Sequence, residues 1–231
     1  MLIAMLFGIA LFVRQIFIYY QAIRSGKTTP FLEQRIQSSF SKLVANANVS
    51  DADLARLAST TGNPSLGHKG APLTIVEFID FGCPFSQLSA MPMRQIMQKF
   101  SKQVYFVVRD FPLDDLHPNA TNLALAARCA GAQGKFWSYH DLLFAHQDKQ
   151  TDADLENFAT QTGLDLAAFR SCYQSRTYER QVQQDLADGL QVGVQGTPTF
   201  FFNGVRVQGG LDFEMLQFLV NHFLSLNPSK L

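Results

Sequence analysis

The chain has 231 residues, of which 47% are hydrophobic and 16% are charged, and this composition suffices for one substantial buried core. Nineteen basic residues balance nineteen acidic residues, so the net charge gives no argument for a nucleic-acid partner and we predict none. The three cysteines, Cys83, Cys129 and Cys172, lack the spacing of a metal site, so we predict no bound metal and no cofactor.

The N-terminal segment is apolar over about the twenty residues that a membrane-crossing helix needs, interrupted by Arg14 and Gln15. Tyr19 and Tyr20 would then lie at a membrane interface. No small-residue cleavage site follows, so we predict an uncleaved transmembrane anchor over residues 1–22. The alternative is an amphipathic helix lying on the membrane surface, which Arg14 supports.

Residues 23–66 are predicted to form a helical stalk and linker. Ser50 to Asp53 read as a capping box that opens a short helix through Leu57. The apolar face of the stalk can pack on the rest of the chain, which we favour, or on a second copy. Turn-forming residues from Thr61 to Gly67 place the domain boundary near Gly67.

Two β-rich runs, residues 73–81 and 104–108, flank a segment with an apolar face at helical spacing. The order strand, helix, strand implies a parallel pair joined by a right-handed crossover. Residues 117–192 then show helical periodicity that predicts four or five helices. Asn203 and Gly204 lie between two short β-rich runs and predict a hairpin, and a helix over residues 211–226 follows.

Cys83 is the first candidate for chemistry, because it lies where the first β-rich run stops and the helical segment begins. Unpaired N–H groups and the positive end of the helix dipole favour a thiolate there, which makes the sulfur nucleophilic. The alternative is a buried structural cysteine.

Three stretches together resemble the DsbA-like branch of the thioredoxin superfamily. They are Pro72-Leu-Thr-Ile-Val-Glu-Phe, Cys83-Pro-Phe-Ser and Gly196-Thr-Pro-Thr-Phe-Phe-Phe-Asn-Gly. The resemblance implies an α/β thioredoxin fold over residues 67–226 with a helical cap inserted at about 115–192. It matches Cys83 to the nucleophile, Pro84 and Phe85 to the dipeptide that tunes it, and Pro198 to a proline whose peptide bond is cis.

Ser86 departs from the family pattern, because it stands where the family has its second, resolving cysteine. A hydroxyl is too weakly acidic to attack a disulfide, although it can donate a hydrogen bond to the Cys83 thiolate. The site is therefore predicted to hold one thiol. An engineered Cys-to-Ser substitution that traps intermediates would leave the same residue pattern.

The resemblance also implies roles for Glu77 and Thr197. Glu77 matches the buried acid under the site, where burial would raise its pKa and let it relay protons. Thr197 would offer its backbone to an extended substrate segment as an added strand. The alternatives are a solvent-facing Glu77 at a sheet edge and an ordinary trans turn at Pro198. Arg109, Asp110 and His117 are assigned structural roles.

Cys129 and Cys172 follow apolar residues on two different predicted helices, so both can face one helix contact. Related members of the family carry a similar pair, and the resemblance implies a structural disulfide that leaves Cys83 free. The alternative is two separately buried thiols, as expected of a cytoplasmic protein.

The favoured hypothesis is a membrane-anchored enzyme that exchanges disulfides on exported proteins through Cys83. Its partners would be cysteine-containing proteins or peptides and a membrane-bound or soluble redox partner thiol. The alternative is a redox-inactive, peptide-binding or chaperone-like module of the same fold. Arg14, Arg24 and Lys27, at or after the span, would hold the domain in the cytoplasm by the positive-inside rule. The family and the expected disulfide favour the extracytoplasmic side, which we predict.

Overall fold

The computed structural model describes residue 14, residues 48–59 and residues 62–226. The anchor expected over residues 1–22 and the first part of the stalk lie outside the described residues, apart from Arg14. In the part of the chain that is described, no helix combines the length and the apolar character that a membrane crossing requires.

A five-stranded mixed sheet, in the order β1-β3-β2-β4-β5, forms the centre of the domain. The strands are β1 (Ser65–Gly67), β2 (Leu73–Ile79), β3 (Val104–Asp110), β4 (Thr199–Phe202) and β5 (Val205–Gln208). β2 runs parallel to β3 and antiparallel to β4, which confirms the predicted parallel pair and makes β2 the central strand. The site residues that follow β2 therefore leave from the middle of the sheet.

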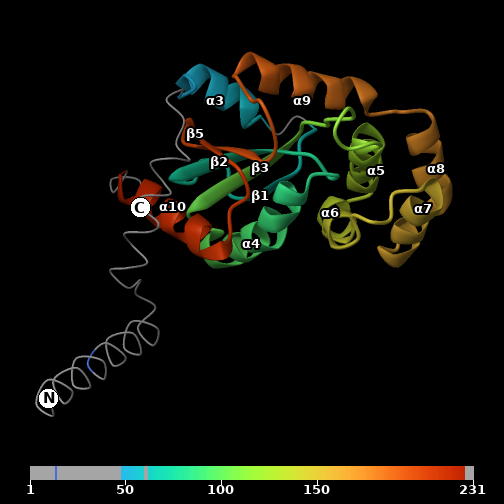
Figure 1. Cartoon of the computed structure of the whole chain (residues 1–231), viewed down its shortest axis with the longest axis horizontal. Helices are drawn as coiled ribbons and strands as arrows, with labels where there is room; N and C mark the ends of the chain where they lie inside the picture. The colour runs from blue at the N-terminus through green and yellow to red at the C-terminus, as the bar shows by residue number, and fades with distance from the viewer. Residues whose placement is uncertain (1–13, 15–47, 60–61, 227–231) are drawn as a thin grey trace, which may run out of the picture. The chain divides into compact units, whose positions relative to one another are not determined.

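Helices cover both faces of the sheet (Figure 1). On one face lie α4 (Pro84–Phe100) and α10 (Phe213–Ser225), and on the other lie α3 (Asp51–Leu57) and α9 (Glu179–Gln191). Alternation along β2 and β4 sends Val76, Phe78 and Phe201 into one apolar cluster with Leu57 of α3. Phe202 points to the opposite face, where its ring stacks on Phe223 of α10.

Between β3 and β4 the chain forms five helices, in agreement with the predicted block of four or five. They are α5 (Ala120–Ala132), α6 (Phe136–Ala145), α7 (Asp152–Gln161), α8 (Leu166–Gln174) and α9. Local sequence explains the start of α7, because Thr151 and Asp154 form a reciprocal capping box. Figure 1 shows α5 to α8 gathered beside the sheet, beyond the end of α4.

The hairpin between β4 and β5 turns at Asn203 and Gly204, as predicted. Both residues have positive φ, 45° and 88°, which an Asn-Gly pair tolerates. Asn203 also ties the hairpin to β2, because its side-chain oxygen accepts a hydrogen bond from the Thr74 N–H at 2.8 Å. The turn chemistry thus fixes the register of β4 beside β2.

The domain begins before the boundary expected near Gly67. β1 adds an antiparallel edge to β3, and Leu57 of α3 is fully buried in the apolar cluster. The backbone N–H of Val49 donates to the carbonyl of Gly204 at 2.9 Å. Residues 49–57 of the expected stalk are therefore part of the domain, whereas the apolar stalk face that precedes them lies outside the described residues.

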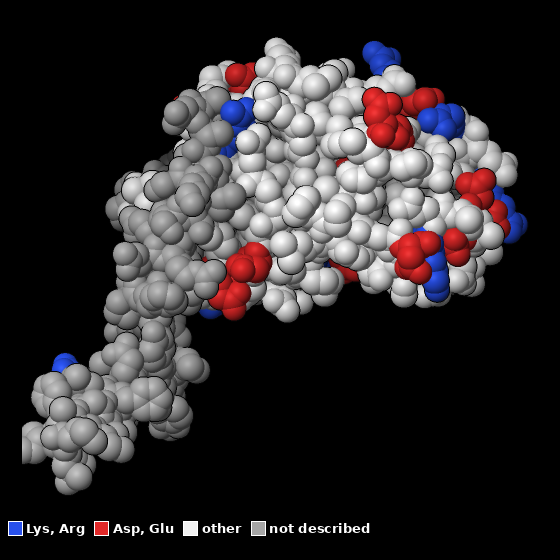
Figure 2. All heavy atoms as spheres, viewed as in Figure 1, with Lys and Arg blue, Asp and Glu red and all other residues white. Residues whose placement is uncertain are grey.

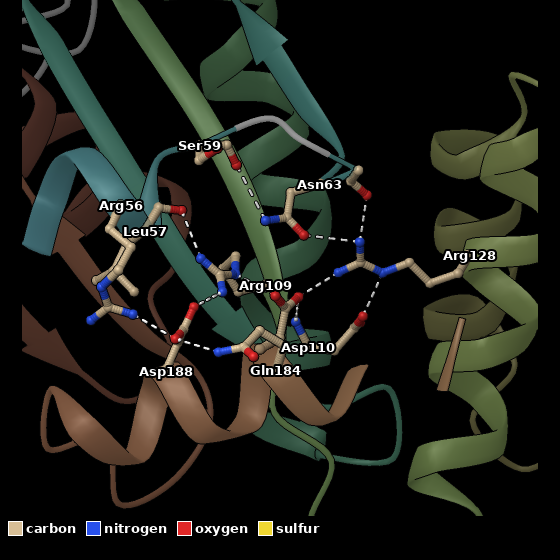
Figure 3. A network of polar contacts seen from close by, with 11 residues as sticks. Arg56, Leu57, Ser59, Asn63, Arg109, Asp110, Arg128, Gln184 and Asp188 are labelled. Atoms are coloured by element: carbon tan, nitrogen blue, oxygen red, sulfur yellow. Dashed lines mark hydrogen bonds and ion pairs between the residues drawn. The ribbon is translucent and has the colours of Figure 1, made fainter. Parts of the chain in front are cut away.

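A buried ionic network joins α3, β3, α5 and α9 (Figure 3). Arg109 of β3 pairs with Asp185 at 2.6 Å and with Asp188, both of α9. Arg128 of α5 pairs with Asp110 at 2.6 Å and with Asp185 at 2.5 Å. Because each buried charge has a partner, the network holds the inserted helices on the sheet, and Arg109 and Asp110 have the structural roles assigned to them.

The surface carries its charges in mixed pairs. Figure 2 shows basic and acidic side chains next to one another at the α7–α8 end of the domain. Arg170 of α8 bonds to Glu156 of α7 there, at 2.7 Å, and Arg176 bonds to Glu179 at 2.9 Å. On the face shown, no large area of a single sign is formed by the described residues.

Candidate active site

Cys83 lies at the point where the chain leaves the central strand and enters α4. It is the N-cap residue of α4, with Pro84 at the first helical position, and no acidic residue lies in the first turn. The Cys83 carbonyl accepts the first helical hydrogen bond from the Gln87 N–H at 3.1 Å. The sulfur therefore lies at the positive end of a seventeen-residue helix.

The Cys83 sulfur faces the loop that leads into β4. Its S–H donates to the Thr197 carbonyl at 3.2 Å, although the two residues are far apart in sequence. The Thr197–Pro198 peptide bond is cis, and the Pro198 carbonyl accepts from the Gly209 N–H at 3.0 Å. The fold thus brings together Cys83, Thr197 and Pro198, three of the residues expected at the site.

Ser86 lies one turn into α4 and is fully buried. Its hydroxyl accepts a long hydrogen bond, 3.5 Å, from the backbone N–H of Asp80. Within the described residues no hydrogen bond joins Ser86 to Cys83, whose S–H is directed at Thr197. Stabilisation of the thiolate by the Ser86 hydroxyl is therefore not seen in this arrangement.

Glu77 lies on central strand β2, 3% exposed, between Val108 of β3 and Phe200 of β4. The alternative position at a sheet edge is therefore wrong. Alternation places Glu77 on the same face as Ile75, which is the face that α4 and α10 cover. Burial raises the pKa of Glu77 to about 8, so its carboxyl group is mostly protonated at pH 7.

Asp80 organises the turn before Cys83, and the sequence analysis gave it no role. Its carboxylate accepts from the Gly82 N–H at 2.7 Å and from the Leu113 N–H at 2.9 Å. The second oxygen also contacts the His117 ring Nδ1 at 2.8 Å. An aspartate that bonds the backbone N–H two residues on is a known turn signal, which could have identified Asp80. His117 therefore helps to hold the turn.

Gln147, in the segment between α6 and α7, is a second contributor that sequence analysis missed. Its side-chain amide donates to the carbonyls of Phe81 and Cys83, at 2.8 and 3.0 Å. Nothing in the local pattern around Gln147 distinguishes it from any other loop glutamine, because its partners lie more than sixty residues away.

The surface beside Cys83 is apolar and open. Phe85, Leu88 and Met91 follow one side of α4 and are 60%, 51% and 54% exposed. A groove of about 250 Å³ runs past Thr197 and Pro198, with Gly196, Gln208 and Gly209 among its lining residues. Pro84, which together with Phe85 was matched to the tuning dipeptide, is also exposed. An extended apolar segment could therefore reach the edge of the thiol site from this side.

Cys129 of α5 and Cys172 of α8 form a disulfide, with their Cα atoms 5.8 Å apart. Sequence analysis expected this pair inside the helical insertion. Cys83 is the free cysteine and is 4% exposed. The single free thiol of the chain is thus the one at the start of α4.

The chain is similar to proteins of the thioredoxin fold. A family model described as thioredoxin matches residues 59–222. A thioredoxin-like oxidoreductase from Silicibacter pomeroyi has a similar structure, with a TM-score of 0.64 and 27% identity over 73% of this chain and 95% of the other. The thiol-disulfide exchange protein α-DsbA2 from Wolbachia pipientis shares the fold, with a TM-score of 0.66 and 17% identity over 74% and 94%.

Curated relatives are longer than this chain. The Na(+)/H(+) antiporter NhaA 3 of Salinispora tropica is 41% identical over 150 residues, which are 65% of this chain and 23% of the antiporter. The chain therefore spans about a quarter of the length of the curated relatives it matches.

Proposed function

Because this chain belongs to the thioredoxin family and its solved neighbours include DsbA-type oxidoreductases, we propose that it exchanges thiols and disulfides through Cys83 alone. The observation that carries this proposal is the position of the Cys83 sulfur. It lies at the N-terminus of α4 and 3.2 Å from the Thr197 carbonyl, with Ser86 where a second thiol would stand.

The first step of disulfide exchange requires one cysteine of the enzyme. The Cys83 thiolate attacks one sulfur of a substrate disulfide, a bond forms between Cys83 and that sulfur, and the other substrate sulfur leaves as a thiolate. Release then needs a second thiol, from the substrate itself or from a partner, because Ser86 cannot attack the mixed disulfide. A further thiol of the substrate that attacks the substrate sulfur forms a new substrate disulfide, and Cys83 leaves as a thiolate. A partner thiol that attacks the Cys83 sulfur releases the substrate as a dithiol and leaves Cys83 bonded to the partner, and a second partner thiol then releases Cys83 and closes a partner disulfide.

Glu77 would supply proton transfer in these steps. A carboxyl group with a pKa of about 8 can both give and accept a proton near neutral pH. Its place on the sheet face beneath α4 supports this role. Phe85 would contact an apolar side chain of the substrate, and the groove beside Pro198, which Thr197 and Gln208 help to line, would receive an extended segment through polar contacts.

The Cys129–Cys172 disulfide supports a site of action outside the cytoplasm, since such bonds persist in oxidising compartments. We propose that the domain lies on the extracytoplasmic side, held to the membrane by residues 1–22. The apolar composition of residues 1–22, which lie outside the described residues apart from Arg14, supports the anchor.

A trapping experiment tests the proposal. The full chain, with Cys83 reduced, is mixed with a disulfide-bonded peptide, all remaining free thiols are alkylated, and the products are separated without reductant. We expect a mixed disulfide at Cys83 that persists until a thiol is added, and none with the matched variant Cys83→Ser. A Cys83 that reacts no faster than a small free thiol would leave the peptide-binding module as the better account, supported by the exposed side chains of Phe85 and Leu88.

A further inference from the structure

The turn from Asp80 to Cys83 sets where the reactive sulfur lies, and part of its hydrogen bonding is local. The Cys83 N–H donates to the Asp80 carbonyl at 3.0 Å, and the Gly82 N–H donates to the Asp80 carboxylate at 2.7 Å. His117 packs against Gly82 so closely that an added Cβ would lie 2.6 Å from the His117 Cβ. One side of the turn is therefore fixed by Asp80 and His117.

The other side of the turn is held from the helical insertion. The Gln147 amide has two hydrogens, and each is directed at one carbonyl, that of Phe81 at 2.8 Å and that of Cys83 at 3.0 Å. These two carbonyls flank Gly82, the residue with the fewest restrictions on its backbone. The Gln147 backbone is itself tied down, because its carbonyl accepts from the Gln150 amide at 2.8 Å.

A second side-chain amide joins the same two parts of the chain, with its donor on the α4 side and its acceptor on the α6 side. Gln87, in the first turn of α4, donates to the carbonyl of Phe144 near the end of α6 at 2.6 Å. The start of α4 and the segment after α6 are thus joined by three hydrogen bonds from two glutamine side chains. The position of the insertion is transmitted directly to the residues around the nucleophile.

We propose that Gln147 is a positioning residue for the Cys83 sulfur, acting through the two carbonyls that flank Gly82. This inference rests on the proposed function, because it concerns the reactivity of Cys83. Without the amide, the Phe81 and Cys83 carbonyls lose a shared donor and the Gly82 backbone can rotate. The sulfur then leaves the geometry in which it faces Thr197.

The test compares variants of the full chain with the insertion disulfide intact. Gln147→Met removes the donor at similar size, and Gln147→Glu keeps the shape but places a carboxylate against two carbonyls. Gln133→Leu is the matched control, since the Gln133 amide also bridges the insertion but bonds to the backbone of Asp165. The readout is the rate constant for reaction of Cys83 with a small disulfide reporter, measured from pH 5 to 9.

We expect Gln147→Met to react about tenfold to a hundredfold more slowly than the native chain, a usual result of displacing a reacting group by about 1 Å. Gln147→Glu should be slow as well, with the midpoint of its rate profile moved to higher pH by the added negative charge. Gln133→Leu should stay within about twofold of the native rate, because its hydrogen bonds lie away from the turn.

Two results would overturn the inference. One is a Gln147→Met chain that reacts as fast as the native chain. The other is an equal loss of rate in Gln133→Leu, which would indicate general loosening of the insertion. Failure of the proposed function is distinct, because it would appear in the native chain as a Cys83 no more reactive than a free thiol.

Discussion

Replacing Glu77 by glutamine should stabilise the domain, and increasingly so as the pH rises. Glu77 is buried on the central strand, and burial alone raises its pKa from 4.5 to about 8. Between these two values the unfolded chain has lost the Glu77 proton while the folded chain retains it. Each rise of one pH unit in this range therefore lowers the free energy of unfolding by about 1.4 kcal/mol relative to a chain without the carboxyl group.

The magnitude follows from the difference between the two pKa values, 8 − 4.5 = 3.5 units. Relative to Glu77→Gln, the native chain should be equal in stability below pH 4, less stable by about 3 kcal/mol at pH 7, and less stable by about 5 kcal/mol above pH 8. Glutamine fits because it has the shape of the protonated acid and carries no charge to desolvate.

Denaturant unfolding of the two chains at pH 4, 5, 6, 7, 8 and 9 measures this difference. Glu214→Gln is the matched control, because Glu214 is exposed in the first turn of α10. Its effect should stay below about 1 kcal/mol at every pH. A Glu77→Gln advantage that is the same at pH 5 and pH 9 would refute the reasoning, since it would mean that the folded chain does not retain the proton.

Three further predictions concern the cysteines and Ser86. Ser86→Cys should oxidise a reduced peptide with faster turnover than the native chain when a disulfide oxidant is supplied, because a second thiol lets the site carry its own disulfide, whereas the native chain depends on thiols of the peptide or a partner to release Cys83. Equal turnover by both chains would contradict the single-thiol mechanism. Replacing Cys129 and Cys172 together by alanine should lower the free energy of unfolding by about 4 kcal/mol, because the disulfide closes a loop of 43 residues, and denaturant midpoints that do not change would contradict this. A thiol reagent that cannot cross membranes should label Cys83 in intact cells, and labelling only after lysis would place the domain in the cytoplasm as the positive-inside rule suggests.

Local sequence patterns predicted those parts of the fold that neighbouring residues determine. The apolar run of β2 and the helical face of α4 identified a parallel pair, because only a crossover can join them. Asn203 and Gly204 identified the hairpin, since they tolerate positive φ without strain. The contact between Cys83 and Thr197 could be predicted for another reason. Two motifs that are far apart in the sequence both resemble motifs of one family.

The features that were missed depend on partners far away in the chain. β1 is three residues long and is a strand because β3 offers it an open edge, which no local pattern records. Arg109 and Asp110 were given structural roles, but their actual partners, on α5 and α9, could not be named from their own surroundings. Gln147 is the clearest case, because its role comes from the position of the whole insertion.

Glu77 and the Arg109 network are both buried, but they differ in whether their charged groups have partners of opposite sign. Around Arg109, Arg128, Asp110 and Asp185, every charge has a partner of opposite sign, as a structural site requires. Burial raises the pKa of Glu77, and among the described residues no ion pair involves its carboxyl group. A carboxyl group kept at a net cost in stability, on the sheet face beneath the helix that begins at Cys83, supports the proposed role of Glu77 as a proton carrier for the thiol. The gain in stability expected from Glu77→Gln should therefore be accompanied by slower exchange at Cys83.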